Sequence, residues 1–169
     1  MRTALLVIAQ NGFQDKEYAG TRVSLESAGF QIVIASKEKG PCSGKFGGTV
    51  MADIAMRDVV LREYDRIAFI GGPGAAAYAS DGDALKLAVE AYRTEMPLGA
   101  ICIAPTILAK AGVLEGKRAT VWNEDGEQSE VLAERGAEYT GEDVTVDGTV
   151  VTANGPDAAE EFGRTLAAL

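Results

Sequence analysis

Short apolar runs alternate along the chain with longer segments in which apolar residues recur at helical spacing. A run that is apolar throughout is typical of a parallel strand covered by helices on both faces. Such runs predict strands at residues 3–9, 31–36, 49–52, 66–70, 98–101 and 119–121. The segments between and after them predict helices at residues 15–28, 84–94, 105–114, 128–134 and 157–169.

Several residues at the ends of these segments carry boundary signals. Asp15 and Asp157 are predicted N-caps of their helices, because a short polar side chain satisfies the free N–H groups of a first turn. Gly29 is a predicted C-cap. Residues 37–48 are glycine-rich and polar, which predicts a loop or a small hairpin.

The C-terminal part predicts a β-hairpin, because Asp147-Gly148 separates apolar residues 144–146 from 150–153. Strands that alternate with helices predict an α/β fold, a three-layer α/β/α sandwich with a mostly parallel sheet. The chain of 169 residues is long enough for one substantial core, and no repeat, linker or low-complexity tract divides it. We therefore expect a single domain over residues 1–169.

The absence of histidine excludes more chemistry than any other count in the composition. It excludes serine or cysteine triads that use imidazole, zinc held by histidine, and HExxH metalloproteases. Two cysteines without a CxxC pair do not make an ordinary structural zinc site. We expect no metal and no cofactor, and proton transfer by a carboxylate, tyrosine, lysine, the thiol itself or water.

The formal charge of −9 and the pI near 4.6 argue against nucleic acid and anionic membranes as partners. No apolar run approaches the length of a bilayer span, and Met1-Arg2-Thr3 leads directly into a predicted strand rather than a signal peptide. Two cysteines in dissimilar surroundings do not suggest a disulfide scaffold. We therefore expect a cytoplasmic protein.

Cys102 carries the clearest chemical signal in the chain. Pro105 is tolerated only in the first turn of a helix, so a helix must begin within about three residues of the cysteine. The thiol then lies on a sharp strand-to-helix turn, where the partial positive charge of the helix favours the thiolate. Cys102 is a candidate nucleophile or redox centre, and the alternative from this pattern is a small buried apolar side chain.

Three predicted loops of unusual composition follow strand ends: residues 11–17, 71–74 and 102–105. Ligands of open parallel sheets bind beyond the carboxyl ends of the strands. If the loops converge there, Glu17 supplies a carboxylate to Cys102, and the backbone amides of Gly72 and Ile103 form an oxyanion hole. Glu17 alone has a simpler explanation, since a carboxylate in the first turn of a helix interacts favourably with the helix dipole.

Three other features have structural explanations. Cys42 lies in the glycine-rich loop and is interpreted as an incidental thiol. Trp122, the single tryptophan, is interpreted as a core or interface residue rather than a substrate platform. The acidic run at residues 124–127 is interpreted as a solvated loop, because its spacing is not that of an EF-hand.

Several motifs in order along nearly the whole chain resemble the ThiJ/PfpI superfamily, which includes the parkinsonism-associated protein and PfpI-type archaeal peptidases. The matching motifs are Phe13-Gln14-Asp15-Lys16-Glu17, Gly44-Lys45-Phe46-Gly47, residues 68–74, residues 100–105, Ala111-Gly112-Val113-Leu114 and residues 151–156. The resemblance implies a flavodoxin-like α/β sandwich related to class I glutamine amidotransferases, and a homodimer or higher homo-oligomer. It also implies a nucleophile-elbow cysteine at Cys102, a carboxylate partner at Glu17, and oxyanion amides at Gly72 and Ile103.

The chain departs from this pattern beside the cysteine. PfpI-type peptidases carry histidine directly after it, where this chain has Ile103. The branch of the parkinsonism-associated protein has a histidine near the site, where this chain places Trp122. The peptidase interpretation loses its base, and the machinery reduces to Cys102, Glu17 and backbone amides. Because a thiolate and a carboxylate in contact repel, we expect Cys102 to be the thiolate and Glu17 to stay protonated and to donate a hydrogen bond to the sulfur.

Such a pair suits an enzyme that acts on small reactive carbonyls. The first hypothesis is a glutathione-independent glyoxalase, or deglycase-like enzyme, that converts methylglyoxal to lactate through a hemithioacetal on Cys102. The second is a redox-sensing or chaperone-like stress protein in which Cys102 is oxidised. A hydrolase or hydratase acting on another small electrophile, and a binding module with a vestigial site, are the remaining alternatives.

Overall fold

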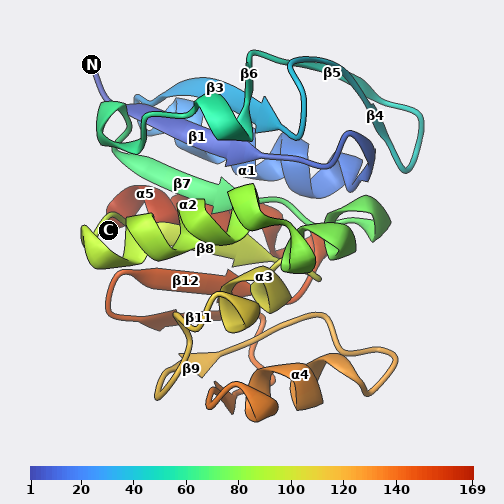
Figure 1. Cartoon of the computed structure of the whole chain (residues 1–169), viewed down its shortest axis with the longest axis vertical. Helices are drawn as coiled ribbons and strands as arrows, with labels where there is room; N and C mark the ends of the chain where they lie inside the picture. The colour runs from blue at the N-terminus through green and yellow to red at the C-terminus, as the bar shows by residue number, and fades with distance from the viewer.

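A seven-stranded, mostly parallel sheet forms the centre of the molecule (Figure 1). The structure is a computed structural model that describes residues 1–169. Six strands run parallel, and the edge strand β11 runs antiparallel to its neighbour. In spatial order the strands are β11 (Val144–Asp147), β12 (Val150–Ala153), β8 (Leu98–Ile101), β7 (Arg66–Phe69), β1 (Thr3–Val7), β3 (Gln31–Ser36) and β6 (Ile54–Ala55).

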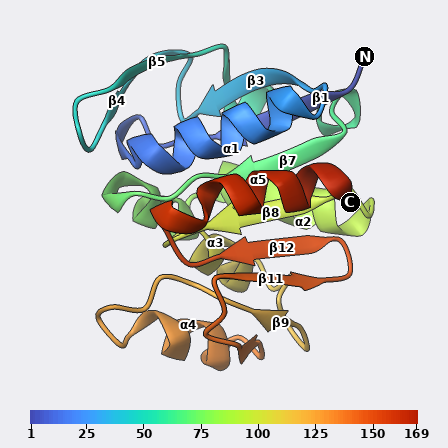
Figure 2. The same cartoon turned by 180° about the vertical axis from the view of Figure 1, so that it is seen from behind.

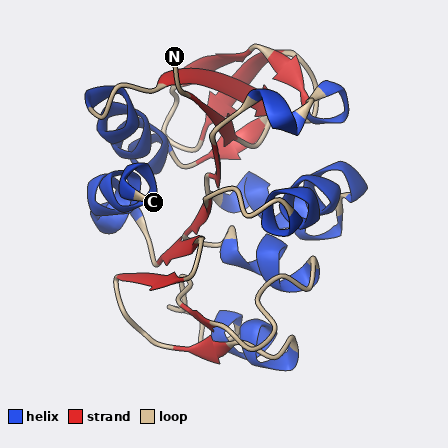
Figure 3. Ribbon diagram, turned by 90° about the vertical axis from the view of Figure 1, so that its left-hand side faces the viewer, coloured by secondary structure: helices blue, strands red, loops and turns tan.

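Helices cover both faces of this sheet. Helices α1 (Asp15–Ser27) and α5 (Ala159–Ala168) lie on one face, in front in Figure 2. Helices α2 (Gly82–Arg93) and α3 (Pro105–Lys110) lie on the other, and the side view of Figure 3 shows the three layers. Helix α4 (Gln128–Glu134) packs on α3 beyond the β11 edge. The predicted α/β sandwich with a mostly parallel sheet and a C-terminal hairpin is confirmed.

The central strands bury side chains on both faces. In β1, Leu5 and Val7 belong to the core beneath α2 and α3, whereas Ala4 and Leu6 belong to the core beneath α1 and α5. All four are at most 1% exposed. Burial on both sides removes the need for polar residues at alternate positions, which explains the continuous apolar run.

Two smaller sheets and four short 3-10 segments complete the chain. The small strands are β2 (Asn11–Phe13), β4 (Gly40–Gly44) and β5 (Thr49–Ala52) in one sheet, and β9 (Arg118–Ala119) and β10 (Glu138–Tyr139) in the other. The 3-10 segments are η1 (Met56–Asp58), η2 (Leu61–Glu63), η3 (Pro73–Ser80) and η4 (Pro156–Ala158). Strands β4 and β5 pair antiparallel, so the glycine-rich stretch forms the small hairpin. No helix combines the length and apolarity that a bilayer span requires.

The two predicted aspartate caps are wrong. Gln14 is the N-cap of α1, and its side-chain oxygen accepts a hydrogen bond from Glu17 N at 2.8 Å. Asp15 already lies in the helix, and its carboxylate instead accepts hydrogen bonds from the β4–β5 loop, from Phe46 N and Gly48 N. Asp157 lies within η4, and its carboxylate pairs with Lys16 Nζ at 2.7 Å, so α5 has no side-chain cap.

Helix boundaries also shift by a few residues. Ala28 is the C-cap of α1, and Gly29 follows it with a left-handed φ of 93°. Helix α2 begins two residues before the predicted position, because the Asp81 carboxylate accepts from the free N–H groups of its first turn. Helix α3 ends at Lys110, and residues 111–114 form turns.

Strand boundaries differ in the same way. Strands β1 and β7 end two residues and one residue earlier than predicted, and the strand predicted at 119–121 is Arg118–Ala119. Asp147 pairs with Val150 in the hairpin, so the two loop residues are Gly148 and Thr149, one position later than predicted. Gly148 adopts φ 60°, which accounts for glycine at the start of the loop.

Candidate active site

Cys102 lies in a strained turn between β8 and α3. Its φ is 63°, a left-handed conformation that costs a non-glycine residue about 1–2 kcal/mol. Backbone hydrogen bonds hold the residue on both sides: Cys102 N donates to Ala153 O, and Cys102 O accepts from Trp122 N, each at 2.9 Å. Pro105 is the first residue of α3, as predicted. The turn presents a half-buried thiol at the carboxyl end of the sheet.

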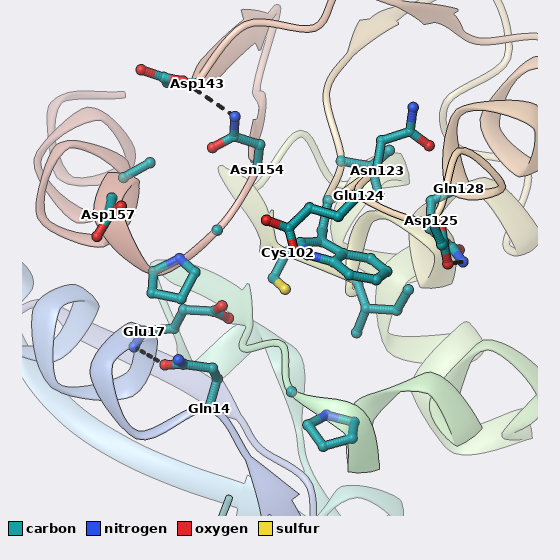
Figure 4. Close-up of a pocket in the computed structure, with 18 of the residues that line it drawn as sticks. Gln14, Glu17, Cys102, Asn123, Glu124, Asp125, Gln128, Asp143, Asn154 and Asp157 are labelled. Atoms are coloured by element: carbon teal, nitrogen blue, oxygen red, sulfur yellow. Dashed lines mark hydrogen bonds between the residues drawn. The ribbon is translucent and has the colours of Figure 1, made fainter. Parts of the chain in front are cut away.

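Glu17 reaches the same point from the first turn of α1. The residue is fully buried, and its Oε1 accepts a hydrogen bond from Gly71 N at 3.0 Å. Its Oε2 is buried and has no hydrogen-bond partner. Figure 4 shows the Glu17 carboxyl group beside the Cys102 sulfur. No hydrogen bond of ordinary geometry joins the two groups, but each shifts the pKa of the other.

Gly71 makes this approach possible. A Cβ atom at Gly71 would lie 2.6 Å from both Cys102 Cβ and Glu17 Oε1, closer than real Cβ contacts allow. The three loops predicted to converge therefore do so, and Gly71, just after β7, packs against both Cys102 and Glu17.

The electrostatics of the pair differ from the predicted thiolate stabilised by a helix N-terminus. Burial raises the pKa of Glu17 to about 7, against the opposing effects of Cys102, the Gly71 amide and Lys45. Burial, followed by the Glu17 charge, raises the pKa of Cys102 to about 12. Between these pKa values the pair holds one proton and one negative charge. Glu17 has the lower pKa of the two, so the carboxylate beside a neutral thiol is the favoured form, contrary to the expectation that Glu17 keeps the proton. The thiolate is the minor form that arises when the proton of Cys102 moves to Glu17.

The two predicted oxyanion amides face the sulfur. The backbone N–H groups of Ile103 and Gly72 lower the pKa of Cys102, although less than burial raises it. Neither N–H is used in a backbone hydrogen bond. Gly72 has a φ of 114°, and a Cβ there would meet Gly12 O. The conformation that aims this amide at the sulfur therefore favours glycine.

A cavity of about 1010 Å³ opens above the pair, and Glu17, Gly72, Cys102 and Ile103 all line it. Trp122 is half-buried and also lines it, so Trp122 is not a core residue. The acidic run is exposed as expected, but Glu124 and Asp125 face the cavity as well. These roles could not be predicted from the sequence, because the loop that begins at Trp122 reaches the thiol only in the folded chain, where Trp122 N donates to Cys102 O.

Two other interpretations bear on the chemistry. Cys42 is 1% exposed in β4, does not line the cavity, and has a pKa raised by burial, which agrees with an incidental thiol. No group of three or more His, Cys, Asp or Glu side chains is arranged to hold a metal ion.

Comparison with known proteins identifies the family. The profile of the DJ-1/PfpI family matches residues 2–169. An uncharacterized protein of Methanocaldococcus jannaschii is 38% identical over 160 residues, covering 94% of this chain and 78% of the relative. The protein named deglycase PfpI of Pyrococcus furiosus is 30% identical over 152 residues, covering 90% of each chain.

Solved structures of similar proteins share the fold. A ThiJ/PfpI domain protein from Brachyspira murdochii superposes with a TM-score of 0.93 at 29% identity, covering 99% of this chain and 96% of that chain. DJ-1beta of Drosophila melanogaster gives a TM-score of 0.88 at 26% identity, covering 98% and 88%. The strand order, the motifs and these matches agree, and this chain belongs to the DJ-1/PfpI family.

Proposed function

We propose that this protein is a cysteine-dependent enzyme that acts on small reactive carbonyl compounds, with Cys102 as nucleophile and Glu17 as its proton partner. The observation that carries the proposal is the buried pair itself, which holds a single proton above about pH 7 and lies beneath an accessible cavity. The relatives named deglycases, at about 30% identity, support an activity of this kind.

The reactive form is a Cys102 thiolate beside a protonated Glu17. In this form the unpartnered Oε2 of Glu17 carries the proton and donates it toward sulfur, while the amides of Gly72 and Ile103 stabilise the anion. A carboxylic acid held neutral by burial in this way is a suitable general acid, because its pKa lies near the pH at which it acts.

Conversion of methylglyoxal to lactate needs only these groups and water. The thiolate forms a C–S bond to the aldehyde carbon, and Glu17 protonates the resulting oxyanion to give a hemithioacetal. The Glu17 carboxylate then removes the C1 proton, which gives an enediolate. Return of this proton to C2, with transfer of the C1 hydroxyl proton to the C2 oxygen, gives a lactoyl thioester on Cys102. Water cleaves the C–S bond, which releases lactate, a proton and the free thiol. No oxidant or reductant enters the balance.

A peptidase is a poorer fit to this site. Amide hydrolysis requires protonation of a poor leaving group by a general acid on the leaving-group side, a part that imidazole plays in cysteine proteases. Ile103, half-buried beside the thiol, provides no such proton. Hemithioacetal formation has no leaving group, so the reduced machinery suffices.

The proposal is tested by lactate formation from methylglyoxal without glutathione. Wild-type protein and a Cys42→Ser variant are expected to form lactate, whereas Cys102→Ala is expected to lose at least about a hundredfold in rate because the nucleophile is gone. Equal rates in wild type and Cys102→Ala, or no lactate from any of them, would contradict the proposal.

A redox role is the competing function, favoured by the same two amides. Two molecules of peroxide oxidise a thiolate to a sulfinate and release two molecules of water. The amides of Gly72 and Ile103, which stabilise negative charge on the sulfur, would then bind the sulfinate oxygens. Sulfinate formation on Cys102, measured by intact mass in protein that makes no lactate, is the outcome that would favour this role over the enzyme.

A further inference from the structure

The wall of the cavity above Cys102 is strongly acidic. Besides Glu17 at its base, five carboxylates line it, from four separate segments: Glu124, Asp125, Asp143, Asp157 and Glu161. Lys45, from the β4–β5 loop, is the cationic residue that lines it. Figure 4 shows Glu124, Asp125, Asp143 and Asp157 spread around the opening rather than gathered on one side.

Most of these charges are not neutralised by a cation. Asp157 pairs with Lys16. Glu124, Asp125 and Asp143 accept hydrogen bonds from the neutral side chains of Trp122, Gln128 and Asn154, at 3.0–3.2 Å. An indole or amide donor orients a carboxylate but leaves its charge in place. Apart from Glu17 and from Asp157, which pairs with Lys16, four carboxylates and one lysine therefore line the cavity.

A cleft lined by charges of one sign focuses the electrostatic potential, because its protein walls screen poorly. The formal charge of −9 adds to the same potential. We propose that this acidic wall restricts Cys102 to neutral or cationic electrophiles and rejects anionic ones of equal size. The inference rests on the proposed function in taking Cys102 as the reacting group. It assigns neutral carbonyl compounds, rather than oxoacids, as the substrate class, and it implies that a carboxylate product is expelled.

The test compares two alkylating agents of nearly equal size, neutral iodoacetamide and anionic iodoacetate, on a Cys42→Ser background. Each forms a C–S bond to Cys102 and releases iodide, and the rate is followed by intact mass. The ratio of the iodoacetamide rate to the iodoacetate rate is expected to exceed that of free N-acetylcysteine about tenfold at low salt. Added salt is expected to reduce this excess, because it screens the wall.

The double substitution Glu124→Gln, Asp143→Asn tests whether the carboxylates of the wall cause the selection. It is expected to lower the ratio of the iodoacetamide rate to the iodoacetate rate about threefold. The matched control is Glu130→Gln, Glu134→Gln, which removes two charges from exposed positions of α4 outside the cavity and is expected to leave the ratio unchanged. A wild-type ratio equal to that of the free thiol overturns the inference, as does an equal response of both double variants.

This experiment separates the inference from the proposed function, because alkylation requires no turnover. Charge selection without lactate formation would overturn the enzyme proposal and leave the inference standing. Lactate formation, together with a ratio of alkylation rates equal to that of N-acetylcysteine, would overturn the inference and leave the enzyme proposal standing.

Discussion

Replacement of Gly71 by alanine is expected to reduce turnover by about a hundredfold, the cost of displacing a reacting group by about an ångström. The added Cβ would lie 2.6 Å from Cys102 Cβ and Glu17 Oε1, and 2.7 Å from the carbonyl oxygen of Ile101. Two of these atoms belong to the rigid elbow and cannot rotate away. The pair must separate, and overpacking is expected to lower the free energy of unfolding by about 1–3 kcal/mol. Lactate formation and urea unfolding measure the two effects.

Gly82→Ala is the matched control for this substitution. A Cβ at Gly82, the first residue of α2, would meet no atom within 4 Å. This variant is expected to keep wild-type turnover and to be at least as stable, because alanine is the better helix former. Wild-type turnover in Gly71→Ala would show that close contact of Cys102 and Glu17 is not required.

The free energy of unfolding is expected to fall as the pH rises from about 5 to about 8, by about 3 kcal/mol from Glu17 alone. The pKa of Glu17 is about 7 in the folded protein against an ordinary value of 4.5. Between those values the folded state binds one more proton than the unfolded state, so a rising pH favours unfolding. Below both values the group is protonated in both states, and the effect disappears. Urea unfolding at a series of pH values measures the slope.

Glu17→Gln is expected to flatten this dependence and to exceed the wild type in stability at about pH 8, because the amide does not titrate. Glu26→Gln provides the control, since Glu26 is an exposed residue of the same helix, paired with Arg22. It is expected to keep the wild-type slope. A slope that persists in Glu17→Gln would assign the pH dependence to other groups.

The sequence predicted the position of Cys102 because proline restricts where a helix can begin, a local rule that tertiary contacts did not override. The layers followed from runs that only a sheet covered on both faces can bury. The burial of Glu17 was not predictable in the same way. A glutamate in a first turn is explained equally well by the helix dipole, and only the packing of Gly71 against it shows that it is desolvated.

The pKa of the thiol and the wall of the cavity also lay beyond the sequence. The helix N-terminus suggested a thiolate, but burial and the Glu17 charge outweigh the amides that face the sulfur. The carboxylates of the wall come from residues 124–161, and no spacing relates them until the chain has folded. Asp15 shows the same limit on a smaller scale, since the β4–β5 loop competes for the side chain expected to cap α1.

The sharing of one proton between Cys102 and Glu17 is tested most directly by the pH dependence of Cys102 alkylation by iodoacetamide, on a Cys42→Ser background. The pair loses its first proton near pH 7, so the alkylation rate is expected to rise through that pH and to reach a plateau. In Glu17→Gln this inflection is expected to disappear, leaving a single thiol titration at a pKa below about 12. A wild-type profile with one inflection near the ordinary thiol value of 9.0, unchanged in Glu17→Gln, would contradict a coupled pair.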